Sequence, residues 1–99
     1  MKGYIFSPPA LADLDGIWDY SAETWGDDQA ERYVLDIHAA CEALASGRKK
    51  GSSAENIRSG YRKLGVGSHF VFYRTTHEGV IDVIRILHQH MDLPSHLDN

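Results

Sequence analysis

The residues best suited to chemistry lie near the end of the chain, where an apolar stretch carries one arginine and stops at histidines. Residues 83–90 read VIRILHQH. A guanidinium group inside an apolar strand must be solvated, paired or directed at an anionic partner, because an unpaired buried charge is very costly. Arg85 is therefore a candidate for binding an anionic group.

His88 and His90 share one face if the strand continues through both, since side chains alternate along a strand. They suit general acid–base chemistry, a metal pair, or ordinary polarity at a strand end. A zinc site needs three or four ligands with matching spacing. The remaining candidates, Asp92 and His96, adjoin or belong to a tail over residues 93–99 that we expect to be flexible. We therefore expect no metal and no cofactor.

A second basic group lies in the middle of the chain. Arg58 and Arg62 share one face of a predicted strand with Gly60 between them, which leaves open space for a phosphate or a carboxylate. The alternative is that both arginines solvate the outer face of a half-buried sheet. Residues 48–50, RKK, are either a solvated part of a loop or a clamp for an anion.

Two helices are predicted in the first half of the chain. Ser7 can cap a helix that begins at Pro8, where the missing N–H of proline is not needed. Gly26 suits the end of that helix, and Asp28 with Glu31 has capping-box spacing for a second one. The short connection predicts an antiparallel hairpin whose joint apolar face needs a cover. The side chains expected in its core are Leu14, Ile17, Trp18, Trp25, Tyr33, Ile37 and Leu44.

The predicted cover is a sheet. A short first strand over residues 2–6 is joined by strands over 57–64, 69–75 and 80–87, with turn-like connectors that force antiparallel pairing of the last three. Residues 46–56 lack periodic apolar positions and form a long loop. The fold class is α+β, in the order β-α-α-β-β-β, with the hairpin on one face of a curved, mostly antiparallel sheet. The sheet residues expected in the core are Phe70 or Val71, Val83, and Ile84 or Leu87.

Composition narrows the function classes. A chain of 99 residues predicts a single domain over residues 1–99. The net charge of −4 argues against a surface that binds nucleic acid throughout, and we expect no direct sequence-specific nucleic-acid binding. The lone cysteine excludes an intramolecular disulfide and fits a reducing compartment. We see no signal peptide and no membrane-spanning stretch, so a cytoplasmic protein is expected.

Several short motifs run along nearly the whole chain. They are Tyr4, Ser7-Pro8, Ala10, Asp13-Leu14, Ile17, Tyr20, Trp25-Gly26, Ala30, Tyr33, Leu44-Ala45, Gly60-Tyr61-Arg62, His69, Tyr73-Arg74 and Ile84-Arg85-Ile86-Leu87-His88. Their order and spacing together resemble the RelE/ParE toxins of bacterial toxin–antitoxin systems, and the ParE branch is the more similar. The resemblance implies the same β-α-α-β-β-β fold.

The resemblance also implies a function. ParE members poison DNA gyrase and block replication, and a cognate ParD-like antitoxin holds them inactive. RelE members instead cleave mRNA on the ribosome, with sheet arginines and often a terminal His-Tyr pair. Carried over by position, Arg62 and Arg85 match the sheet arginines and His90 matches the histidine, but Met91 stands where the tyrosine would be. A thioether neither transfers a proton nor stacks on a base as a phenol does.

The sequence therefore favours a ParE-like toxin that binds DNA gyrase and carries no catalytic residue. The acid excess agrees, because a ribosome-directed nuclease approaches a dense field of phosphates. The candidates for contact with the target or with an anion are Arg58, Arg62, Arg85, His88 and His90. The alternatives are a RelE-like ribosome-dependent mRNA endonuclease, in which Arg62, Arg85 and His90 are catalytic, and a degenerate member that binds its antitoxin without a toxic target.

Overall fold

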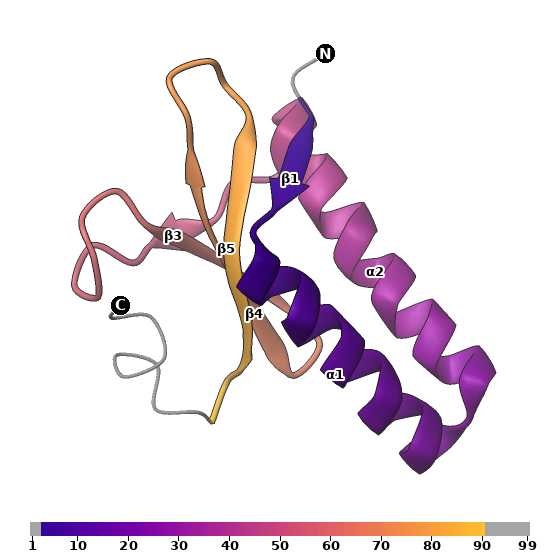
Figure 1. Cartoon of the computed structure of the whole chain (residues 1–99). Coiled ribbons are helices and arrows are strands. Elements are labelled where there is room, and N and C mark those ends of the chain that lie inside the picture. Colours follow the sequence, from indigo (N-terminus) through magenta and orange to yellow (C-terminus); the bar gives the residue numbers. More distant parts are fainter. Residues whose placement is uncertain (1–2, 91–99) are drawn as a thin grey trace.

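The computed structural model describes residues 3–90, and Figure 1 shows a helical hairpin lying against one face of a strongly twisted sheet. The predicted flexible tail over residues 93–99, and Met91 and Asp92 before it, lie outside the described residues. In chain order the elements are β1 (Tyr4–Phe6), α1 (Pro8–Trp25), α2 (Asp27–Ser46), β2 (Ser52–Ser53), β3 (Arg62–Val66), β4 (His69–Thr75) and β5 (Ile81–His88). This confirms the predicted α+β class. No helix in the described range is long and apolar enough to cross a membrane.

The two helices begin and end where local chemistry requires. The Ser7 hydroxyl accepts a hydrogen bond from the Ala10 N–H at 3.2 Å, and α1 starts at Pro8 as predicted. Gly26, with φ of +95°, both ends α1 and stands at the N-cap of α2. The predicted capping box of Asp28 is wrong, because this single-residue connection places Asp28 inside the first turn of α2.

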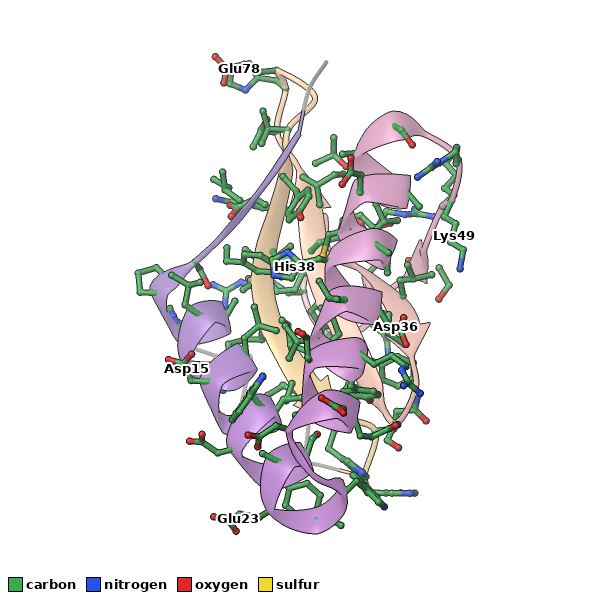
Figure 2. All side chains as sticks on the ribbon, turned by 90° about the vertical axis from the view of Figure 1, so that its right-hand side faces the viewer. Asp15, Glu23, Asp36, His38, Lys49 and Glu78 are labelled. Carbon is green, nitrogen blue, oxygen red and sulfur yellow. The ribbon has the colours of Figure 1, made fainter. Side chains whose placement is uncertain are left out.

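The sheet has the strand order β1-β5-β4-β3-β2. β1 lies parallel to β5 at one edge, with Tyr4 opposite Ile81 and Phe6 opposite Val83, and the other pairs are antiparallel. Figure 2 shows His38 of α2 near the middle of the molecule. The Nδ1 atom of His38 lies 2.9 Å from the Tyr4 hydroxyl of β1. The first strand therefore contacts both the last strand and the second helix.

The segment before β3 is a turn rather than the start of the predicted 57–64 strand. The Arg58 N–H donates to the Ala54 carbonyl at 3.1 Å, and Gly60 has φ of +84°, which a strand does not allow. The Gly60 N–H donates to the Glu55 carboxylate at 2.8 Å. Arg58 and Gly60 consequently do not share a strand face with Arg62. Within the predicted loop, Ser52 and Ser53 form the short strand β2 on β3.

A β-bulge in β5 changes which of its side chains face the helices. Phe72 pairs with Arg85, but Tyr73 pairs with Val83, so Ile84 is an extra residue. Because one added residue reverses the alternation, Val83 before the bulge and Ile86 after it both face the hairpin. The expectation of Ile84 or Leu87 in this core is wrong, and Ile86 takes that place.

The core facing the helices contains most of the predicted residues. Its buried members include Leu14, Ile17, Ile37, Leu44, Val71, Tyr73, Ile81, Val83 and Ile86, with Tyr33 packed against them. The opposite face carries a smaller cluster of Ala54, Phe72 and Leu87, covered by Ile57, Tyr61 and Phe70. Trp18 and Trp25 are not core residues, since 37% and 63% of their surface is exposed.

The helix core can be tested on a single helix. Ile37→Ala should lower the free energy of unfolding by about 2–5 kcal/mol, because Ile37 is fully buried and the truncation leaves a cavity. Leu35→Ala on the exposed side of α2 is the matched control and should change it by less than about 0.5 kcal/mol. Equal denaturant midpoints for the two variants would contradict this core.

Candidate functional site

A cavity lies between the hairpin, the start of β4 and the end of β5. Its volume is about 530 Å³, and we call it the aromatic groove. Its principal lining residues are Ile17, Tyr20 and Trp25 of α1, Tyr33 of α2, His69 of β4 and His88 of β5. The groove is thus built from both helices and from the end of the sheet that β1 does not reach.

Two exposed aromatic side chains form the outer wall of this groove. Tyr20 and Trp25 are 64% and 63% exposed, and their rings meet edge to face with centroids 6.0 Å apart. Large apolar rings left in water beside a concave surface are typical of protein interaction sites, where Trp and Tyr carry much of the binding energy. The chemistry of this wall favours binding of an apolar partner segment.

The inner wall is polar and fixed. The Tyr33 hydroxyl accepts the Ser68 N–H at 2.9 Å and lies 2.7 Å from His69 Nδ1 and 3.1 Å from the Val66 carbonyl. If the hydroxyl hydrogen is donated to Val66, His69 carries its hydrogen on Nδ1. A side chain at Gly67 would collide with the Tyr33 ring. The turn between β3 and β4 is therefore held closely against α2.

Three histidines follow one another across the end of the sheet. His69 lies opposite His88 with ring centroids 5.3 Å apart, and the rings of His88 and His90 are 5.1 Å apart. Burial lowers the pKa of His69 below its usual value, His88 lowers that pKa further, and Asp13 opposes the shift. Across residues 3–90, no group of at least three His, Cys, Asp or Glu side chains has an arrangement suited to a metal ion.

Arg85 is held by a carboxylate of the first helix. Its Nε and one terminal nitrogen donate to the two Asp13 carboxylate oxygens at 2.7 and 2.9 Å, and the Ile86 N–H donates to the same carboxylate at 2.9 Å. The side chains of Arg85 and Asp13 are only 21% and 14% exposed. The hydrogen bond to Asp13 raises the pKa of Arg85, which shows that the contact favours the charged guanidinium.

The predicted site residues therefore lie in different places. Arg58 is on an exposed turn, whereas Arg62 lies opposite Tyr73 on the helix-facing side of β3 and donates to the Gly51 carbonyl. Arg85 of β5 is held by Asp13, and the rings of His88 and His90 contact each other with centroids 5.1 Å apart.

The resemblance to the toxin family implies an apolar groove beside the helices, but the residues that line the aromatic groove were not predicted from the sequence. The sequence predicts Trp25 and Tyr33 as core residues and Tyr20 as part of a family motif, because helical periodicity does not separate a buried aromatic residue from one at the border of the apolar stripe. One signal in the sequence could have indicated the groove. Tyr20 and Trp25 lie in the last turns of α1, just before the helix ends at Gly26.

The chain is similar to known toxins over almost its whole length. Residues 4–93 match the family model described as ParE toxin of type II toxin–antitoxin system, parDE. A protein named Toxin ParE1 from Mycobacterium tuberculosis is 48% identical over 94 residues, which cover 95% of this chain and 96% of that protein. Toxin ParE1 from Caulobacter vibrioides is 46% identical, with 98% and 99% covered.

A solved structure agrees with the sequence comparisons. It is the chromosomal ParDE TA system from P. aeruginosa, and one of its chains superposes with a TM-score of 0.74 at 25% identity. The match covers 89% of this chain and 95% of the other. The similarity therefore extends to most of the fold formed by the helical hairpin and the sheet.

The contact between Asp13 and Arg85 gives one testable prediction. Asp13→Ala should lower the free energy of unfolding by about 2–4 kcal/mol, because Arg85 loses its carboxylate and the Ile86 N–H loses its acceptor. The control is Asp82→Ala, which removes the ion pair with Arg74, a side chain that is 58% exposed, and should cost less than about 1 kcal/mol. Equal losses in urea denaturation would refute the structural role of Asp13.

His69 gives a prediction for acid. Its pKa is lower in the folded chain than the value of about 6.5 in an unfolded one, so the unfolded state binds the proton more readily. His69 should therefore not change the melting temperature above about pH 6.5. Below that pH it should lower the melting temperature progressively. His69→Gln should reduce the fall between pH 7.5 and 5.5, whereas His77→Gln on an exposed turn should not. The same pH profile for both variants would contradict the assignment.

Proposed function

This chain belongs to the ParE toxin family of type II toxin–antitoxin systems, and we propose that it inhibits DNA gyrase until a cognate ParD-like antitoxin binds it. Inhibition of gyrase stops replication, so the protein arrests growth when the antitoxin is lost. The proposal places this action in the cytoplasm. In this account the toxin acts by binding and performs no chemistry of its own.

The observation that carries the proposal is the engagement of Arg85 by Asp13. A nuclease of this fold needs its sheet arginines directed at the scissile phosphate, where charge develops in the transition state. Here one of them is paired with a helix carboxylate, and Arg62 contacts the Gly51 backbone on the helix-facing side of the sheet. This arrangement supports a binding function over phosphodiester cleavage.

The aromatic groove supports the antitoxin part of the proposal. An amphipathic helix commonly binds by placing its apolar face in a groove of a partner. The exposed rings of Tyr20 and Trp25 offer the aromatic anchors that such interfaces use. We therefore propose that an amphipathic segment of the antitoxin covers the aromatic groove and that its binding withdraws the toxin from gyrase.

The target is tested by brief induction of the toxin with the antitoxin absent. Gyrase-linked DNA breaks and an active DNA-damage reporter, with intact transcripts, are the expected result. His90→Ala should keep this activity if the imidazole transfers no proton, whereas a nuclease would lose roughly 10²- to 10⁴-fold in cleavage rate. Co-expression of the neighbouring antitoxin gene should restore growth.

Two other outcomes would replace the proposal. Rapid cleavage of translated messages with a silent damage reporter would assign the chain to the ribosome-dependent nucleases. Normal growth on induction, together with tight binding to the antitoxin, would identify a member that has lost its toxic target.

A further inference from the structure

A second cavity brings together two basic features that lie apart in the sequence. Lys49 and Lys50, on the loop after α2, and Arg62 of β3 line a cavity of about 430 Å³ at the C-terminal end of α2. We call it the basic cavity. Figure 2 shows Lys49 on the chain that leaves α2, on the opposite side of the hairpin from Asp15 of α1.

The loop that carries these lysines is held at both ends. The Lys49 N–H donates to the Ala43 carbonyl at 3.1 Å, and the Gly51 N–H donates to the Tyr73 hydroxyl at 2.9 Å. Arg62 donates to the Gly51 carbonyl from the other side. No side chain fits at Gly51, since a Cβ there would lie 2.5 Å from the Lys63 carbonyl oxygen. The lysines are therefore presented by a fixed segment, which lowers the entropy lost on binding.

The cavity has positive charge without a matching negative group. None of its described lining residues is acidic, and neither lysine forms an ion pair with any residue in the range 3–90. The Nε of Arg62 is buried and has no hydrogen-bond partner among the same residues. A buried donor without a partner is costly, and guanidinium groups bind oxyanions strongly. These features indicate a site for an anionic group.

The size and the walls of the cavity narrow the ligand class. Leu44, Tyr73 and Ile81 give it an apolar side, and its volume exceeds that of a lone oxyanion. The ligand should therefore carry an apolar group beside its negative charge, as an acidic peptide does. A nucleic acid fits less well, because the remainder of a chain with net charge −4 repels a phosphate backbone.

We infer that the basic cavity binds an acidic segment of the antitoxin in which Asp or Glu adjoins an apolar residue. This inference rests on the proposed function. The aromatic groove uses Gln29 and Tyr33 near the start of α2, and the basic cavity uses Leu44 and Gly47 at its end. A 20-residue helix is ~30 Å long, so an extended segment of ~9–10 residues connects the two positions. The antitoxin thus engages both ends of α2.

The inference is tested with the purified toxin and the antitoxin encoded beside it. Lys49→Gln combined with Lys50→Gln should raise the Kd of the complex about 3- to 20-fold at low salt and make the Kd less dependent on salt. Lys63→Gln also removes a positive charge, but Lys63 lies on the other face of the sheet over the Phe70 ring. Lys63→Gln is therefore the control for a loss of positive charge outside the basic cavity, and it should change the Kd less than twofold.

The readouts separate the inference from the proposed function. Both lysines are exposed, so the melting temperature of the double variant should equal that of the wild type. An unchanged Kd in the double variant, with wild-type toxin still bound by antitoxin, would overturn the inference alone. Failure of the wild-type toxin to bind the antitoxin would remove the proposed function as well. If the double variant binds the antitoxin with an unchanged Kd but no longer inhibits gyrase on DNA, the basic cavity contacts gyrase and the inference is overturned.

Discussion

The open edge of β5 is the constraint on which the rest of the structure depends. β1 is short and covers β5 only as far as Val83. Beyond it, the Ser7 N–H donates to the Val83 carbonyl at 2.9 Å, and the Ser7 hydroxyl donates to the Ile84 carbonyl at 2.7 Å. Asp13 then accepts the Ile86 N–H. The start of α1 replaces the missing strand, because backbone groups at a partly buried edge need partners.

This replacement also determines where α1 lies and what Arg85 does. Asp13 can accept from Ile86 only if the second turn of α1 lies beside β5, and the same carboxylate then pairs with Arg85. The bulge at Ile84 is part of the arrangement, since it turns Ile86 and His88 toward the hairpin. The aromatic groove exists because the rest of α1 continues past the end of the sheet.

The molecule presents two chemically different surfaces at the ends of α2. The aromatic groove offers exposed rings and an apolar interior, which give binding energy through burial. The basic cavity offers localised positive charge on an acidic protein, which gives selectivity more than affinity. A partner that matches both surfaces binds more tightly than one that matches only the aromatic groove. This difference in affinity would let a toxin select its own antitoxin.

Much of the fold follows from local sequence alone. The ends of α1, the residues of β4 and the α+β order were predictable, because capping residues, glycines and apolar periodicity act over a few neighbouring positions. The family was also recognisable, since its motifs are spread in order along the chain. These features need no knowledge of which distant residues meet.

The site depended on contacts that only the folded chain creates. Arg85 and Asp13 are 72 positions apart, so the sequence indicated a charge needing a partner but not its identity. The bulge at Ile84 arises from cross-strand register, and the exposure of Trp25 from the length by which the hairpin passes the sheet. Lys50 and Arg62 line one cavity because the Gly51 N–H donates to the Tyr73 hydroxyl and Arg62 donates to the Gly51 carbonyl. Residue chemistry is local, whereas the pairing that turns it into a site is set by tertiary packing.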